Sequence, residues 1–87
     1  MARYELVFRK SVSRDFLPIP KKDVARILKR IEALQEDPRP GASEKLSGLE
    51  RYRVGQGGYR ILYEITDHHL IFTVVKVAHR RYAYRSG

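Results

Sequence analysis

Basic and aromatic side chains gather in the second half of this 87-residue chain, and they are the residues whose types can carry chemistry. They are Lys45, Arg51, Arg53, Arg60, His79, Arg80, Arg81, Tyr82 and Tyr84. Such a set suits binding a phosphodiester and stabilising the charge that builds during its cleavage. In RNA the 2′-OH is already a neighbouring nucleophile, so alignment and charge stabilisation suffice without a metal. Arginine, with a pKa above about 12, is a poor acid or base, so we expect an electrostatic role for it.

Other catalytic chemistries have little support in the sequence. The chain has no cysteine, and therefore no thiol nucleophile, disulfide framework or thiolate metal site. His68 and His69 are adjacent in an expected turn, where their side chains diverge, and no carboxylate pair is evident. The glycines at 55–58 lack the Gly-Lys-Ser/Thr ending of a phosphate-binding loop. We expect neither a cofactor nor a metal.

The charge of the chain points to an acidic partner. Eighteen Lys and Arg against ten Asp and Glu give a formal net charge of +8 and a pI near 10.1. A basic surface gains free energy from counterion release when it binds phosphates, so the favoured partner is a nucleic acid or an acidic protein. The alternative is a soluble basic protein without such a partner.

One stretch, residues 51–65, organises the rest of the chain. Tyr52 and Val54 alternate with arginines, and Tyr59, Ile61, Tyr63 and Ile65 alternate with more polar residues, which predicts two strands. The glycines between them predict a tight turn. A symmetric turn centred on Gln56 and Gly57 would place Arg53 directly opposite Arg60. Like charges side by side are unfavourable, and a phosphate site would justify them. We expect Tyr59 and Tyr63 to pack in the core.

The remaining elements follow from periodicity, prolines and capping residues. They are a strand over 2–8, a short helix capped by Ser11 or Ser13 and ending at 16 or 17, a helix over 21–36, a loop over 39–43, a turn over 66–69, a strand over 70–77, and a short strand or helical turn after 78. On the long helix Val24, Ile27, Leu28, Ile31 and Leu34 form one apolar stripe, and we expect its basic flank to face solvent. The strand over 70–77 is apolar throughout and should be central in the sheet.

This order, β-α-α-β-β-β, predicts an α+β fold: a small antiparallel sheet with two N-terminal helices packed on one face. We expect a single domain over residues 1–87, because the chain has no repeat or linker and is short for two cores. The N-terminus lacks the plan of a signal peptide, and no apolar run has the length of a membrane span. These features are compatible with a cytoplasmic protein that does not contact a membrane.

The chain resembles the RelE/ParE superfamily of toxins from type II toxin–antitoxin systems. The resemblance covers nearly the whole chain, and short motifs in a shared order carry it. They are Tyr4-x-Leu-x-Phe8, Leu34-Gln-Glu-Asp-Pro38, Lys45-Leu-x-Gly48, Tyr52-Arg-Val54, Gly58-Tyr-Arg-Ile-Leu-Tyr63 and His79-Arg-Arg-x-x-Tyr84. RelE-like members are metal-independent mRNA interferases, which cut mRNA in the A site of the 70S ribosome by attack of the 2′-OH on the adjacent phosphorus. ParE-like members instead inhibit DNA gyrase and lack RNase activity.

The resemblance also implies roles for residues and partners. Arg53 and Arg60 would hold the scissile phosphate, Arg80 would face the leaving 5′ oxygen, and Tyr84 would orient or stack on the mRNA. Lys45, Arg51, His79, Arg81 and Tyr82 are expected to contribute to RNA binding. An acidic, RelB-like antitoxin would neutralise the toxin, and the pair would bind operator DNA through the antitoxin.

One position departs from the RelE-like pattern. Many relatives carry a second basic residue two positions after Arg53, and in some it is assigned as the general base. Here that residue is Gly55. His79 or Arg51 could replace it, or the enzyme is slow, or the chain acts by binding alone. The ParE-like alternative therefore stays open at this point.

Overall fold

The computed structural model describes residues 3–46 and 51–83, without the side chains of residues 82 and 83. Its elements are β1 (Glu5–Phe8), α1 (Val12–Phe16), α2 (Lys21–Glu36), β2 (Glu44–Lys45), β3 (Arg51–Gln56), β4 (Tyr59–Thr66), the 3-10 helix η1 (Asp67–His69), β5 (Ile71–His79) and α3 (Arg80–Ala83). The α+β class and the long helix over 21–36 are confirmed. The first strand begins at Glu5 rather than residue 2, and the two-residue strand β2 was not predicted.

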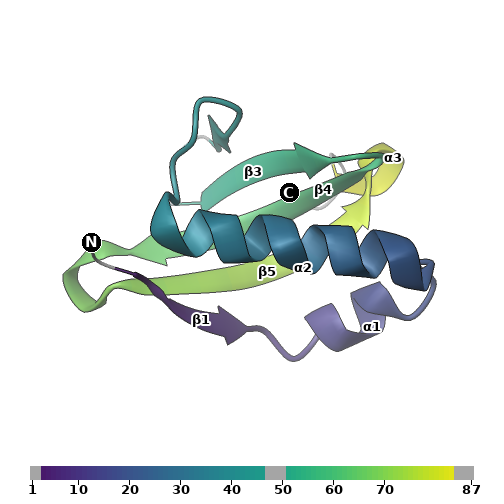
Figure 1. Cartoon of the computed structure of the whole chain (residues 1–87), viewed down its shortest axis with the longest axis horizontal. Coiled ribbons are helices and arrows are strands. Elements are labelled where there is room, and N and C mark those ends of the chain that lie inside the picture. The colour runs from purple at the N-terminus through teal and green to yellow at the C-terminus, as the bar shows by residue number, and fades with distance from the viewer. Residues whose placement is uncertain (1–2, 47–50, 84–87) are drawn as a thin grey trace.

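The sheet has five strands in the order β1-β5-β4-β3-β2, and α2 crosses in front of it (Figure 1). The pairs β2–β3, β3–β4 and β4–β5 are antiparallel, but β1 pairs with β5 in parallel, so the expectation of a wholly antiparallel sheet was wrong. A parallel pair needs a long crossover, and here all the chain between β1 and β5 supplies it. The apolar strand β5 lies between β1 and β4, as its composition predicted.

The core lies between α2 and one face of the sheet. Ile27 and Ile31 are fully buried on α2, whereas Leu28, expected on the same stripe, is 43% exposed at its edge. From the sheet, the ring of Tyr63 stacks between Tyr52 and Phe72, with ring centroids 5.7 and 4.6 Å apart. The core role predicted for Tyr63 is therefore confirmed.

The hydroxyl of Tyr63 fixes the segment that follows α2. It donates a hydrogen bond of 2.8 Å to the carbonyl of Pro38, and burial raises the pKa of Tyr63 to about 12. Because Pro38 begins the connection to β2, this buried bond ties the edge of the sheet to its centre. The backbone leading to Glu44 thus has a fixed starting point.

The short helix α1 is not capped by a serine side chain, although the sequence predicted such a cap. Ser11 occupies the N-cap position but makes no side-chain capping bond, and the Ser13 hydroxyl donates to the carbonyl of Lys10. Asp15 instead accepts a hydrogen bond from the backbone N–H of Val77, close to an irregularity in the β4–β5 register. A contact to the sheet, rather than a local cap, therefore holds this five-residue helix.

The hairpin of β3 and β4 closes one residue later on each strand than the sequence suggested. Gln56 pairs with Tyr59, so the loop is Gly57-Gly58, and Gly57 has a φ of 61°, which favours glycine. Arg53 therefore pairs with Leu62, and Arg60 pairs with Gly55. The expected direct pairing of Arg53 with Arg60 was wrong because only Gly57 and Gly58 leave the strands. The register moves by two residues, so the side chains keep their predicted faces.

Candidate phosphate-binding site

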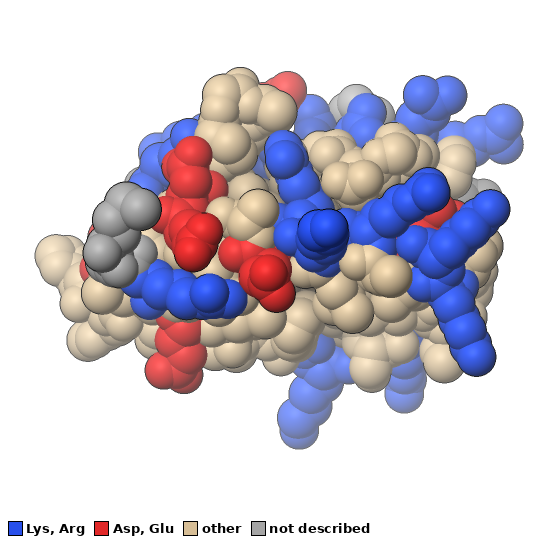
Figure 2. Space-filling view, in the orientation of Figure 1, with Lys and Arg blue, Asp and Glu red and all other residues tan. Residues whose placement is uncertain are grey.

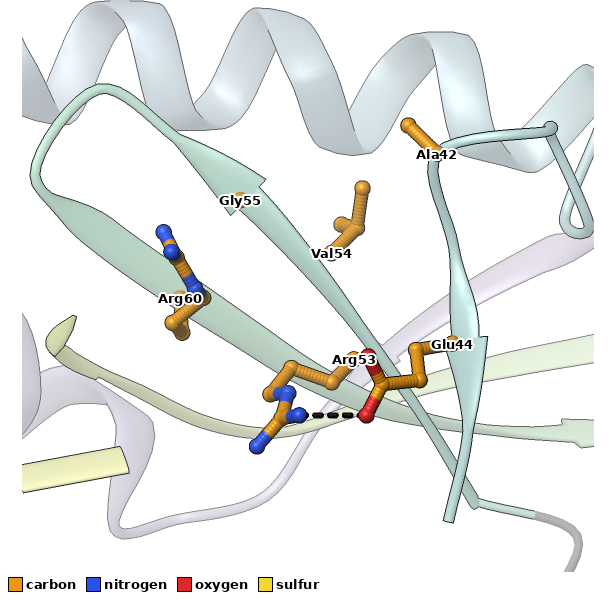
Figure 3. A pocket seen from close by; sticks show the side chains of 6 residues that line it. All are labelled: Ala42, Glu44, Arg53, Val54, Gly55 and Arg60. Atoms are coloured by element: carbon orange, nitrogen blue, oxygen red, sulfur yellow. Dashed lines mark hydrogen bonds and ion pairs between the residues drawn. The ribbon is translucent and has the colours of Figure 1, made fainter. Parts of the chain in front are cut away.

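A pocket of about 210 Å³ lies where the edge strand β2 meets β3 and β4 (Figure 3). Its lining residues are Ala42, Glu44, Arg53, Val54, Gly55 and Arg60. Two of the arginines that the sequence singled out therefore line one cavity. They stand on the sheet face opposite α2, because the alternate residues of β3 and β4 fill the core.

Arg53 is held by an ion pair across the edge of the sheet. Its Nη2 lies 2.5 Å from Oε1 of Glu44, which is its register partner on β2. The Arg53 side chain is only 14% exposed, whereas that of Glu44 is 66% exposed. Arg53 also flanks Leu62, which is 2% exposed although it faces away from α2, so the aliphatic part of an arginine can cover it.

Arg60 enters the same pocket from β4. It is the diagonal neighbour of Arg53, since Arg53 pairs with Leu62, two residues further along β4. Its Nη1 donates a hydrogen bond of 3.2 Å to the carbonyl of Tyr59. Within residues 3–46 and 51–83 it makes no ion pair with a carboxylate. Two guanidiniums thus line one pocket, and Glu44 is the one carboxylate among its six lining residues.

Arg51 shares this face but has a different neighbour. It pairs with Glu64 across the β3–β4 ladder, through Nη2 and Nε at 2.7 and 3.1 Å from the same oxygen. Arg9 binds the other oxygen of Glu64 at 3.2 Å. The structure therefore places Arg51 beside the pocket in a network of its own, and outside the pocket lining.

Lys45 and His79 lie on the opposite face of the sheet from Arg53 and Arg60. Lys45 pairs with the core residue Tyr52, and it lines a separate pocket. His79 pairs with Tyr59 and packs edge-on against its ring, with the centroids 5.8 Å apart. Its Nδ1 accepts a hydrogen bond from the backbone N–H of Arg81. His79 is therefore not placed to replace a missing base at position 55.

Arg80 and Arg81 begin α3 at the end of β5. Both are exposed, and the backbone N–H of Arg80 donates to the carbonyl of Gly58 at 2.8 Å. Arg80 follows Ala78, the register partner of Arg60, by two residues. The basic tail thus starts next to the hairpin turn and near the pocket. Tyr84 and the side chain of Tyr82 lie outside the described residues.

Of the six lining residues, the sequence predicted only Arg53 and Arg60 for the site. Glu44 was assigned to no element because a two-residue strand leaves no periodic pattern. Gly55 was grouped with the glycines of the turn, although it belongs to β3. The register of β3 against its neighbouring strands would have placed both residues at the pocket. That register depends on which residues form the turn, and the sequence alone does not determine them.

Basic side chains also gather at one end of the molecule. Figure 2 shows Lys and Arg concentrated over the end that carries α3 and the start of α2, and most Asp and Glu in the other half, with basic side chains among them. Among the described residues no group of three or more His, Asp or Glu side chains is placed to hold a metal ion. No helix in this part of the chain is both long and apolar enough to cross a membrane.

Chemically, the pocket suits an anion with several oxygens. Two guanidiniums at adjacent positions can each donate paired N–H groups to phosphate oxygens. They can also stabilise negative charge that increases at phosphorus, because they are already in place before the reaction. A ligand phosphate would compete with Glu44 for Arg53.

Known structures share the fold over most of its length. The RelBE2 toxin–antitoxin complex of Mycobacterium tuberculosis has a chain with a TM-score of 0.82 and 25% identity, covering 92% of this chain and 94% of that one. The archaeal RelE–RelB complex of Pyrococcus horikoshii gives 0.77 and 23%, covering 92% and 97%. The RelBE toxin–antitoxin complex of Escherichia coli gives 0.78 and 20%, covering 87% and 95%.

A comparison with protein families identifies the family of this chain. No curated protein sequence matches the chain. Residues 6–84 match the family described as the ParE toxin of the type II toxin–antitoxin system parDE. This match spans nearly the whole chain, and the RelE structures share its fold. The chain therefore belongs to the ParE toxin family and is a type II toxin of the RelE/ParE superfamily.

Proposed function

We propose that this toxin is a ribosome-dependent endoribonuclease that cleaves mRNA in the ribosomal A site. The observation that carries the proposal is the meeting of Arg53 and Arg60 in one pocket on the exposed sheet face. Two guanidiniums lining one small cavity suit the binding of a phosphate and the stabilisation of its added charge. The similarity of the fold to RelE toxins supports the same activity.

In the proposed reaction the 2′-oxygen bonds to the adjacent phosphorus and the bond to the 5′ oxygen breaks, which leaves a cyclic phosphate. Arg53 and Arg60 bind the non-bridging oxygens and stabilise their added charge. Among the six lining residues only Glu44 can accept the 2′-OH proton, because the guanidiniums stay protonated. Arg80 donates a hydrogen bond to the leaving 5′ oxygen, which takes its proton from water, and Tyr84 stacks on the mRNA. Lys45, Arg81 and Tyr82 contact RNA outside the pocket.

The proposed partner for neutralisation is an acidic, RelB-like antitoxin. The similar structures from Mycobacterium tuberculosis and Escherichia coli are toxin–antitoxin complexes. A flexible acidic chain can cover a large basic surface, although it must become ordered on binding. Operator DNA would be bound through the antitoxin, and the toxin would act in the cytoplasm.

The second candidate is inhibition of DNA gyrase by binding. The matched family is that of ParE toxins, and position 55 lacks the second basic residue of many RelE-like enzymes. In this case the arginines of the pocket would contact the target without cleaving anything.

Cleavage on programmed ribosomes tests the proposal. We expect the purified protein to cut mRNA on ribosomes and to leave free RNA intact, because the A site holds the 2′-OH and phosphorus in line. Arg60→Ala should lower the cleavage rate by roughly 10²-fold, because it removes a preorganised group that stabilises the charge of the transition state. Arg26→Ala, 68% exposed on α2, serves as the matched control and should cleave at the normal rate. Intact mRNA together with inhibited supercoiling by gyrase would favour the second candidate.

A further inference from the structure

Gly55 is the residue that Arg60 covers. A Cβ atom built at Gly55 would lie 2.8 Å from Nη1 of Arg60, 3.3 Å from Cζ and 3.7 Å from Nε. The whole guanidinium therefore lies across β3 above the Cα of Gly55. Arg60 is also the register partner of Gly55, so its side chain crosses to the facing strand rather than extending away from the sheet.

The backbone at position 55 does not call for glycine. The glycine with a positive φ in the described residues is Gly57, whereas Gly55 continues the ladder of β3. Glycine inside a strand is unfavourable, because it loses more chain entropy on folding and packs no side chain. Its presence here needs another reason, and the space that it leaves for a guanidinium supplies one.

We propose that Gly55 is a positioning residue, which holds the Arg60 guanidinium in the pocket beside Arg53. In this position Nη1 reaches the carbonyl of Tyr59, and the charge lines the same pocket as the Arg53–Glu44 pair. A side chain at position 55 would exclude the guanidinium from this place. Relative to the RelE-like pattern, the chain lacks the second basic residue on β3, and the guanidinium of Arg60 lies over that position.

The inference predicts the effect of a basic residue at position 55. A lysine there adds a charge, but its Cβ and Cγ would occupy the place of the Arg60 guanidinium. Because the displaced atoms belong to the far end of a flexible side chain, the fold accommodates the change while the pocket does not. A basic residue at position 55 should therefore weaken phosphate binding rather than restore a site.

Gly55→Ala and Gly41→Ala form a matched pair for the test. A Cβ at Gly41 would have nothing within 4 Å, and Gly41 has no positive φ, so the control adds the same methyl group without a clash. Both variants should be as stable as the parent or slightly more stable, since alanine reduces the conformational entropy of the unfolded chain. Thermal unfolding checks that each variant is folded.

The first measurement needs no ligand. The Nε–Hε resonance of Arg60, identified by its loss in Arg60→Ala, should shift in Gly55→Ala and stay in place in Gly41→Ala. An unchanged resonance in folded Gly55→Ala would overturn the inference. This readout reports where the guanidinium lies and is independent of any enzymatic activity.

The second measurement rests on the proposed function, because it treats the pocket as a site for an RNA phosphodiester. The probe is a 2′-O-methyl dinucleotide, which has one phosphodiester and cannot be cleaved by its own 2′-oxygen. We expect Gly55→Ala to bind it roughly tenfold more weakly than Gly41→Ala does. In the Arg60→Ala background Gly55→Ala should have no further effect, since the two residues act through one another.

The outcomes distinguish the positioning role of Gly55 from the proposed function of the pocket as a phosphodiester site. If the parent protein binds the probe and Gly55→Ala binds it equally well, the positioning role is wrong and the proposed function stands. If the parent protein does not bind the probe while the Arg60 resonance shifts in Gly55→Ala, the positioning role stands and the pocket is no phosphodiester site. Additive effects of Gly55→Ala and Arg60→Ala on binding would also contradict the inference.

Discussion

Arg51, Arg53 and Arg60 face the same side of the sheet. Arg51 and Arg53 differ in the carboxylate that each of them binds. Arg51 binds Glu64, which is 32% exposed on the interior strand β4 and shared with Arg9. Arg53 binds Glu44, which is 66% exposed on a two-residue edge strand. A carboxylate at a short, exposed edge can move aside for a ligand more easily than one in the middle of a ladder. At the scale of residues, the candidate site is therefore at Arg53, where a ligand can displace the partner carboxylate of Glu44.

Glu44→Gln tests this competition. The variant should bind inorganic phosphate up to about fivefold more tightly, the range for losing an exposed ion pair worth roughly 0.2–1 kcal/mol. On programmed ribosomes the same variant should cleave more slowly, because the amide cannot accept the 2′-OH proton. Glu36→Gln is the control: it removes the same charge from a side chain 65% exposed at the end of α2. Weaker phosphate binding by Glu44→Gln, measured by calorimetry, would mean that Glu44 orients Arg53 instead of competing for it.

At the scale of elements, the segment between α2 and β2 is held from two sides. Arg39 donates to both oxygens of Asp67, at 3.3 and 2.8 Å, and its Nε donates to the hydroxyl of Tyr52 at 2.9 Å. Tyr4 donates to the same carboxylate at 2.8 Å. This cluster joins the chain before β1, the connection after α2, and η1. It therefore sets where β2, and with it Glu44, meets the sheet.

The pH dependence of stability should report this cluster. Hydrogen bonds from Arg39 and then Tyr4 lower the pKa of Asp67 below its ordinary value of 3.8. A lowered folded pKa means that the carboxylate stabilises the fold above its unfolded pKa, and that this contribution is lost as the pH falls through the folded pKa. Asp67→Asn should therefore have a lower Tm than the parent at pH 6, and the difference should shrink toward pH 2. A difference in Tm that stays constant over this range would exclude the charge of Asp67 as its cause.

At the scale of the whole molecule, charge is distributed unevenly. On the face shown in Figure 2, basic side chains concentrate at the end with α3 and the start of α2, whereas most acidic ones lie in the other half, with basic side chains among them. Along α2 itself, Lys21 and Lys22 precede Asp23 in the first turn, and Glu36 ends a last turn that has no basic residue. Apart from Asp23, this order opposes the helix dipole, which favours acidic residues at the N-terminus and basic ones at the C-terminus. An arrangement unfavourable for the isolated helix is understandable if the basic end attracts an acidic partner.

Association kinetics with the antitoxin should depend on salt accordingly. Steering by the basic end raises the association rate, and salt screens it over roughly 10 Å at 0.1 M. We expect the association rate in stopped-flow experiments to fall steeply with ionic strength, while the dissociation rate changes little if apolar contacts hold the complex. An association rate equal at low and high salt would show that the partner does not recognise the basic surface.

Local patterns in the sequence determined much of the fold. The 3.6-residue period and the flanking prolines define α2, and the alternation of Tyr52, Val54, Ile61 and Tyr63 defines which face of β3 and β4 enters the core. Both depend on side chains close in sequence. The placement of Arg53 and Arg60 on one face of the sheet was predicted correctly although their direct pairing was not, because the register differs by two residues.

Tertiary structure alone decided the composition of the pocket. Residue 57 rather than 56 opens the turn, and this choice places Gly55 under Arg60. The anchoring of Pro38 by Tyr63 brings Glu44 to Arg53, although nothing near Glu44 in the chain marks it as a strand. Likewise, β1 pairs in parallel with β5 across the whole length of the chain. Such contacts depend on the relative free energies of alternative registers and pairings, which short-range periodicity leaves open because several of them present the same residues to the core.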